Sequence, residues 1–134
     1  MKETTLDDPG TSYSGSILVV DDDPPVLTIL CTMLRALGYS VTEATSGAEA
    51  LEKFAAGGRE IRLLVTDVVM PQMNGIQLAA EIKRQAPCVK VLYTSGYDLS
   101  VLRSQGYAVE QLDAFLSKPF VPAILAKLVR KLLT

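Results

Sequence analysis

Five charged side chains stand directly after short apolar runs, and together their types suggest one piece of chemistry. Asp21, Asp22 and Asp23 follow the first such run, Asp67 follows a second, and Lys118 follows the last. In a parallel α/β sheet the carboxyl ends of the strands open onto one edge, where ligands usually bind. If these runs are strands of one sheet, four acids and one lysine meet in one crevice. The sequence therefore predicts a divalent-cation site that contains a reactive carboxylate.

The run of three aspartates is itself an argument for a bound cation. Adjacent carboxylates repel one another and raise one another's pKa when no cation is near. Mg²⁺ takes oxygen ligands and keeps several waters, so two or three carboxylates suffice to hold it. We expect Mg²⁺, with Mn²⁺ as the alternative ion. The competing interpretation is a solvated acidic turn in which Asp23 caps the following helix.

Three further residues fit phosphoryl chemistry around such an ion. The carboxylate of Asp67 could attack phosphorus and form an acyl phosphate, provided that the charge on the phosphoryl group is neutralised. Thr94 could donate a hydrogen bond to a phosphoryl oxygen, and Lys118 could neutralise that oxygen or a neighbouring carboxylate. Taken singly, an ordinary loop acid, a helix-capping hydroxyl and a surface lysine explain these residues as well. Their joint position at strand ends favours the chemistry.

Strand-like and helix-like segments alternate five times along the chain and would position these residues. This alternation predicts an α/β fold with a doubly wound parallel five-stranded sheet in the order 2-1-3-4-5. We expect residues 1–14 to be a flexible tail or linker and residues 15–134 to be one domain. The predicted strands are residues 17–21, 40–44, 61–66, 89–93 and 114–117, and the predicted helices are residues 24–37, 46–56, 76–85, 98–105 and 121–133.

Composition excludes several other classes of function. The chain has no histidine, so a histidine-based triad, a histidine-ligated zinc site and a phosphohistidine donor on this chain are excluded. The net charge of −2 and the absence of a basic stripe argue against direct nucleic-acid binding. Its apolar runs are too short for a membrane span, and we expect no membrane contact and a cytoplasmic location. Cys31 and Cys88 are expected to be reduced thiols in or near the core.

Four segments together resemble the receiver domain of two-component response regulators. They are ILVVDDDPPVL, LLVTDVVMPQMNG, VLYTSGY and AFLSKPF, and the resemblance covers about residues 16–133. It implies the CheY-like, flavodoxin-type fold that the alternation also predicts. The TSGY and FLSKPF segments, and a stretch over residues 106–113 that departs from the family's usual approach to its last strand, are most similar to receivers of hybrid histidine kinases. The chain would be either a stand-alone receiver or one excised from such a kinase.

The resemblance assigns the metal and the phosphoacceptor to particular residues. Asp67 would be the phosphorylated aspartate and also a metal ligand. Asp22 would ligate Mg²⁺ directly, Asp21 would act nearby, often through a water, and the backbone carbonyl of Val69 would supply another ligand. Asn74 stands where the family often has aspartate, a difference that we expect to leave the chemistry unchanged.

The same resemblance assigns a conformational switch. Thr94 and Lys118 would contact the phosphoryl group and couple its arrival to loop movement. Phe115 matches the aromatic switch position of the family, and the Lys118–Pro119 peptide bond would be cis. The change would alter a protein-interaction face made by the fourth helix, the fifth strand and the fifth helix.

The predicted function is Mg²⁺-dependent phosphoryl transfer to Asp67 from the phosphohistidine of a histidine kinase or a histidine phosphotransfer protein. Pro25 and Val26 on the first helix are candidates for docking that donor, and the downstream partner is unknown. One rival is an aspartate-dependent phosphatase opening on Asp21-x-Asp23, although Pro25 occupies a position where that class has Thr or Val. The other rival is a degenerate receiver that signals without phosphorylation.

Overall fold

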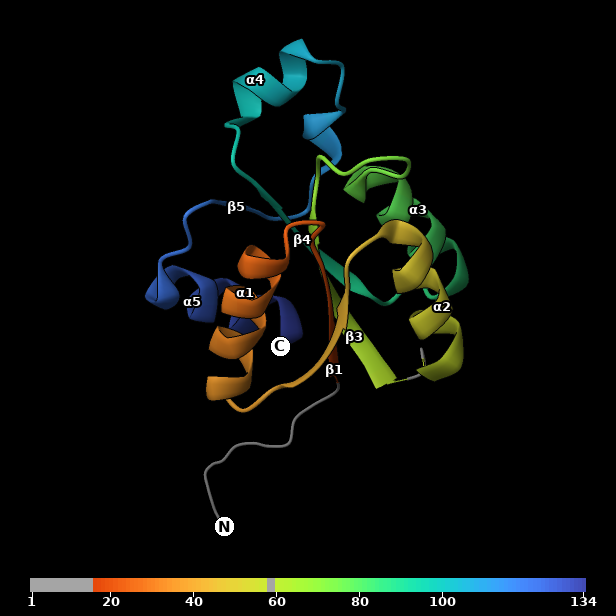
Figure 1. The fold of residues 1–134 in the computed structure, drawn as a ribbon, viewed down its shortest axis with the longest axis vertical. Coiled ribbons are helices and arrows are strands. Elements are labelled where there is room, and N and C mark those ends of the chain that lie inside the picture. The colour runs from red at the N-terminus through yellow and green to blue at the C-terminus, as the bar shows by residue number, and fades with distance from the viewer. Residues whose placement is uncertain (1–15, 58–59) are drawn as a thin grey trace.

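Five parallel strands form the centre of the structure, a computed structural model that describes residues 16–57 and 60–134 (Figure 1). They lie in the order β2-β1-β3-β4-β5, which confirms the predicted topology and places the apolar strands centrally. The predicted tail or linker over residues 1–14 lies outside the described residues. The strands are β1 (Ser16–Val20), β2 (Ser40–Ala44), β3 (Ile61–Asp67), β4 (Lys90–Ser95) and β5 (Phe115–Ser117).

Helices cover both faces of the sheet, as Figure 1 shows with α1 and α5 on one side and α2 and α3 on the other. This arrangement follows from right-handed crossovers between parallel strands. Of the described helices, none has the length and hydropathy that a membrane span requires. The helical segments are α1 (Pro24–Ala36), α2 (Gly47–Gly57), α3 (Gly75–Gln85), α4 (Leu99–Ser104), the short 3₁₀ helix η3 (Val109–Gln111) and α5 (Pro122–Leu133).

Alternate residues of each strand point to opposite faces, so the sheet divides the core in two. Leu18 and Leu64 pack toward α2 and α3, whereas Ile17 and Leu63 pack toward α1 and α5. Both sets are fully buried. The strands are therefore apolar on both faces, as parallel strands covered by helices on each side must be. In the central strands β3 and β4 the buried polar residues Thr66, Asp67, Thr94 and Ser95 lie at the carboxyl ends, where the site lies.

The turn from β1 into α1 differs in one detail from the prediction. Asp23 occupies the N-cap position of α1, but its side chain makes no capping hydrogen bond. The first two helical residues are Pro24 and Pro25, which have no N–H to donate. Instead, the backbone N–H of Asp23 donates to Asp21 Oδ1 over 2.9 Å. The turn thus holds the carboxylate of Asp21 rather than the end of the helix.

Two other features were not predicted. The short helix η3 lies between α4 and β5, in a stretch without a clear periodic pattern. Cys31 is buried as expected, but Cys88 is exposed because it lies in the turn after Pro87, between α3 and β4. Both thiols are free.

Candidate functional site

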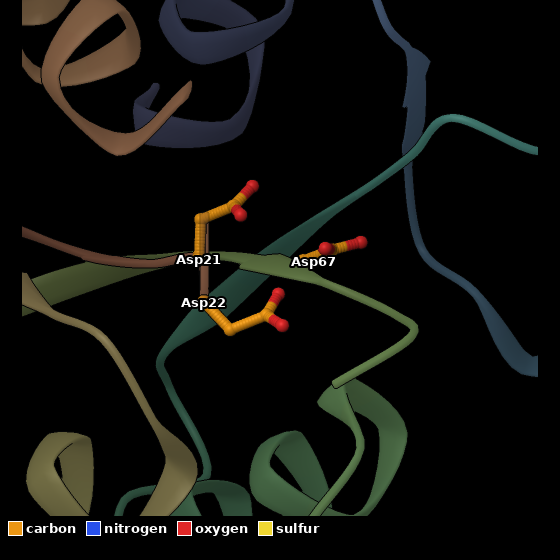
Figure 2. A group of neighbouring side chains, drawn as sticks. All are labelled: Asp21, Asp22 and Asp67. Carbon is orange, nitrogen blue, oxygen red and sulfur yellow. The ribbon is translucent and has the colours of Figure 1, made fainter. Parts of the chain in front are cut away.

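Three aspartate side chains meet at the carboxyl edge of the sheet. Asp21 and Asp22 follow β1 directly, and Asp67 is the last residue of the neighbouring strand β3. One carboxylate oxygen from each lies within 4.8 Å of the others, and Figure 2 shows the three side chains side by side. Asp21 is fully buried, Asp67 is 6% exposed and Asp22 is exposed. Asp23 is not a member of this group.

Lys118 reaches the same carboxyl edge from β5, the outer strand on the side of β3 away from β1. It follows β5, and its backbone N–H continues the strand pairing by donating to Ser95 O over 2.9 Å. Its ammonium nitrogen lies 2.8 Å from Asp21 Oδ2 and 3.2 Å from Asp67 Oδ2. The Lys118–Pro119 peptide bond is cis, as the resemblance implied. The structure therefore brings one lysine between two of the carboxylates.

The electrostatics of this pocket oppose ionisation of Asp67. Burial raises the pKa of Asp67 to about 6, the negative charge of Asp21 adds to that rise, and the positive charge of Lys118 opposes it. Burial alone would lower the pKa of Lys118, but contact with the carboxylates of Asp21 and Asp67 outweighs it and raises that pKa. One lysine thus faces more than one acid, which leaves an excess of negative charge that a cation would neutralise.

Two buried oxygen atoms in this region have no hydrogen-bond partner among the described residues. They are Asp21 Oδ2, whose close neighbour is the Lys118 ammonium group, and Thr94 Oγ1. Thr94 is paired with Asp67 in the register of β3 and β4, so its hydroxyl belongs to the same edge. Buried polar atoms are rarely left without partners. The oxygen donors fit a hard cation such as Mg²⁺, and the free hydroxyl fits a further oxygen-bearing ligand.

Capping does not explain Thr94. Helix α4 begins after Asp98, and the side chain of Asp98 accepts the capping hydrogen bond from the N–H of Val101 over 3.0 Å. The alternative in which Thr94 caps the next helix is therefore wrong.

Neither Val69 nor Phe115 is a member of the carboxylate group, although the backbone of Val69 contacts Asp67. Val69 is half-buried in the loop after β3, and its backbone contributes a hydrogen bond that lowers the pKa of Asp67. Phe115 begins β5, pairs in register with Tyr93 and packs against the core on the α2 and α3 side. The roles that the resemblance gives to these residues stay predictions.

An apolar groove lies beside the pocket, and the sequence indicated it only in part. Pro25 and Val26, the predicted docking candidates on the first helix, are exposed and half-buried respectively. Ile29, which is 52% exposed, was missed, although its position one helical turn after Val26 places it on the same face. The groove has a volume of about 170 Å³ and is lined by Val26, Ile29, Met33, Lys118, Pro119 and Phe120.

Comparison with known proteins gives a single family. Residues 17–130 match the family described as the response regulator receiver domain. The sensor kinase CckA of Brucella abortus is 36% identical over 122 residues, which cover 91% of this chain and 13% of that kinase. The chain therefore spans a small part of this relative.

Solved structures agree with the sequence comparison. The receiver domain of the hybrid histidine kinase CckA superimposes with a TM-score of 0.74 at 32% identity, covering 90% of this chain and all of that one. The response regulator TrrA of Thermotoga maritima, solved in complex with Mg²⁺ and BeF, gives a TM-score of 0.77 at 33% identity with the same coverage.

Proposed function

The chain belongs to the response regulator receiver domain family, and we propose that Asp67 accepts a phosphoryl group from the phosphohistidine of a histidine kinase or a histidine phosphotransfer protein. One observation carries the proposal: the buried carboxylate of Asp67 contacts Lys118 beside Asp21 and Asp22, next to the unpartnered hydroxyl of Thr94. Residues 15–134 would act as one receiver domain.

The transfer exchanges one bond to phosphorus for another. A carboxylate oxygen of Asp67 forms a bond to phosphorus while the bond from phosphorus to the imidazole nitrogen breaks. The electron pair of the broken bond leaves with the imidazole, which is protonated as it departs. Asp67 must be ionised to attack, and a pKa of about 6 leaves it mostly ionised at neutral pH. The product is an acyl phosphate, which water later hydrolyses.

Mg²⁺ is the ion that we expect the pocket to hold, with Mn²⁺ as the alternative. Asp22, Asp67 and the carbonyl of Val69 would be its protein ligands, and Asp21 would act through a bound water. When bound, the ion neutralises charge on the phosphoryl oxygens during transfer. The excess of carboxylates over lysine at this edge supports the assignment.

The remaining residues would bind the phosphoryl group and report its arrival. Lys118, already within 3.2 Å of Asp67, would contact a phosphoryl oxygen, and Thr94 would donate its free hydroxyl to another. Movement of Thr94 would leave space for Phe115 to turn inward. This change would shift the equilibrium between two arrangements of the face made by α4, β5 and α5.

The phosphodonor would dock over the groove between α1 and the segment after β5. The apolar lining of the groove, which includes Ile29 and Phe120, supports docking of a helix, and its shared residue Lys118 would put that helix next to the pocket. The same transfer to Asp67 would take place in a stand-alone receiver and in a receiver within a hybrid kinase. In both, the exchange would occur in the cytoplasm.

The test uses a histidine phosphotransfer protein that carries phosphohistidine, mixed with the chain and Mg²⁺. Intact-protein mass spectrometry should find one phosphoryl group on the wild type and none on Asp67→Asn. Asp23→Asn is the matched control, since Asp23 is an exposed neighbour outside the carboxylate group, and it should be labelled normally. Equal labelling of wild type and Asp67→Asn would contradict the proposal.

A further inference from the structure

The backbone that follows the carboxylate of Asp67 is held from three directions. Thr66 Oγ1 donates a hydrogen bond to Asp67 O over 3.0 Å. The N–H of Gly75 donates to Val68 O, and the N–H of Val68 donates to Thr94 O, each over 2.9 Å. Thr66, Asp67 and Val68 are all buried. The peptide groups on either side of Val68 are therefore tied to β4 and to the start of α3.

Gly75 approaches this backbone more closely than any other residue type could. A Cβ atom at Gly75 would lie 2.2 Å from Asp67 O, 3.0 Å from Asp67 C and 3.1 Å from Thr66 Cγ2. The first two are backbone atoms, which cannot turn aside as the end of a flexible side chain can. Any side chain at position 75 must therefore displace either the start of α3 or the peptide of Asp67.

The start of α3 is itself firmly held. Its first turn is fixed by a reciprocal capping box, in which Asn74 Oδ1 accepts from the N–H of Gln77 and Gln77 Oε1 accepts from the N–H of Asn74. Leu78 and Ile82 anchor its inner face in the core. We therefore expect a substitution at Gly75 to strain the junction between the start of α3 and the peptide that carries the Asp67 side chain.

Other glycines provide the contrast. A Cβ atom at Gly47 would first meet the side chain of Met73, with the sulfur 2.7 Å away and Cβ and Cγ 3.0 Å away. A Cβ atom at Gly57, near the end of α2, would meet nothing within 4 Å. Of these three positions, Gly75 is the one at which a Cβ atom would clash with backbone. Gly57 therefore offers a matched control for a glycine-to-alanine change.

Thr66 restrains the same carbonyl from the other side. Its hydroxyl is fully buried and donates to the carbonyl of the next residue, so it restricts rotation of the Asp67–Val68 peptide. That peptide joins the acceptor carboxylate to the segment that leads to Val69. A valine at position 66 keeps the shape of threonine but cannot donate this hydrogen bond.

We infer that Thr66 and Gly75 are positioning residues for the phosphoacceptor. Neither belongs to the carboxylate group, and they act by fixing the backbone from Asp67 to Val69, from which both the nucleophilic carboxylate and the Val69 carbonyl project. This inference rests on the proposed function of Asp67 and extends it to two residues outside the charged pocket. Small misplacements of a reacting group cost large factors in rate.

The test compares four variants with the wild type: Gly75→Ala, Thr66→Val, Thr66→Ser and Gly57→Ala. Three quantities are measured under conditions in which each variant is fully folded by circular dichroism. They are the Mg²⁺ dissociation constant, the rate of Asp67 labelling by acetyl phosphate, and hydrogen exchange of the Val68 amide in metal-free protein. Acetyl phosphate needs no partner protein, so docking does not enter the result.

Gly75→Ala should slow labelling and weaken Mg²⁺ binding by about tenfold or more, since the clash is with backbone. Thr66→Val should slow labelling and weaken Mg²⁺ binding by about fivefold each, which corresponds to the loss of one net hydrogen bond. Both changes should speed exchange of the Val68 amide. Thr66→Ser keeps the hydroxyl and should restore the wild-type values, and Gly57→Ala should match the wild type throughout.

The outcomes separate this inference from the proposed function. If the wild type is labelled and folded Thr66→Val and Gly75→Ala bind Mg²⁺ and react at the wild-type rate, the positioning role is wrong, even if both variants are less stable. If Gly75→Ala does not fold, Thr66→Val and Thr66→Ser decide. If the wild type itself is not labelled, the proposed function fails, while Mg²⁺ affinity and Val68 exchange still decide whether these residues hold the backbone.

Discussion

Two groups of charged side chains in this molecule are built in opposite ways. On the exposed side of α3, Glu81 accepts hydrogen bonds from Arg84 and Gln85, which lower its pKa to about 2. At the carboxyl edge of the sheet, burial raises the pKa of Asp67 to about 6 even though Lys118 is in contact with it. Hydrogen bonds dominate at the first carboxylate, and loss of water dominates at the second.

The difference indicates which of the two groups is suited to bind a ligand. Glu81 is hydrated and satisfied by neighbours on its own helix, so it needs nothing further. Asp67 shares one lysine with Asp21 in a buried pocket, where Thr94 also keeps a hydroxyl without a partner. Such an arrangement costs stability in the isolated protein, and a bound cation and an oxygen-bearing ligand would supply the missing partners.

The largest expected effect in this comparison comes from removing the half-buried ammonium group of Lys118. Lys118→Met leaves Asp21 and Asp67 facing one another without a positive charge, and we expect a loss of about 3 kcal/mol in the free energy of unfolding. Lys83→Met is the matched control, because it breaks the exposed ion pair with Asp113 and should cost less than about 1 kcal/mol. Urea denaturation without divalent cations measures both. Equal losses would mean that burial does not distinguish the two pairs.

Mg²⁺ should supply positive charge to the carboxylate pocket and so raise the free energy of unfolding. At a free concentration one hundred times its dissociation constant, Mg²⁺ should stabilise the wild type by about 2.7 kcal/mol. Asp22→Asn removes one carboxylate from the group and should need a higher concentration for the same effect. Thermal unfolding across a Mg²⁺ titration checks this. An unfolding midpoint that does not move with Mg²⁺ would exclude the cation site.

The raised pKa of Asp67 predicts a pH dependence of definite sign. A carboxyl group with a folded-state pKa of about 6 and an ordinary value of 3.8 binds its proton more tightly in the folded protein. Its contribution to stability is therefore fully present below about pH 4 and is lost as the pH rises through 6. Asp67→Asn does not titrate, so at pH 7 without metal it should be more stable than the wild type by roughly 2–3 kcal/mol.

Denaturant unfolding of both proteins between pH 4 and pH 7 measures this difference. The advantage of Asp67→Asn should shrink steadily as the pH falls toward 4. A difference that stays constant over the range would mean that Asp67 has no raised pKa in the folded state.

The smallest effect should come from the exposed group. Arg84→Gln removes a hydrogen-bond donor to Glu81, and the solvent can replace it. The unfolding midpoint should be indistinguishable from that of the wild type, and Mg²⁺ affinity should not change. A clear loss of stability would show that exposed charge pairs matter here as much as buried ones.

The sequence was sufficient to predict the sheet topology because its apolar pattern agrees with the positions of the residues that end helices and strands. Continuous apolar runs predicted buried parallel strands. Gly38, which has a φ of +99°, follows the end of α1 close to the predicted boundary. The segment over residues 106–113 has no such periodicity, so η3 was missed. Cys88 was misjudged because residue type alone favours burial, whereas the turn after Pro87 decides its exposure.

The sequence was less informative about how the site is held. It indicated which residues would meet, because strand ends in a parallel sheet share an edge. It could not indicate that Lys118 contacts Asp21 more closely than Asp67, since a side chain of that length has many rotamers. Nor could it reveal the contact of Gly75 with Asp67 O, which depends on where α3 begins relative to β3.

The central claim is that Asp67 carries the phosphoryl group, and mapping the modified residue tests it most directly. The wild type is phosphorylated with acetyl phosphate and Mg²⁺, the acyl phosphate is reduced with borohydride, and the converted residue is located by peptide mass spectrometry. Conversion is expected at Asp67 and at no other aspartate. Conversion at Asp21, Asp22 or Asp23, or none at all under conditions where Mg²⁺ binds, would contradict it.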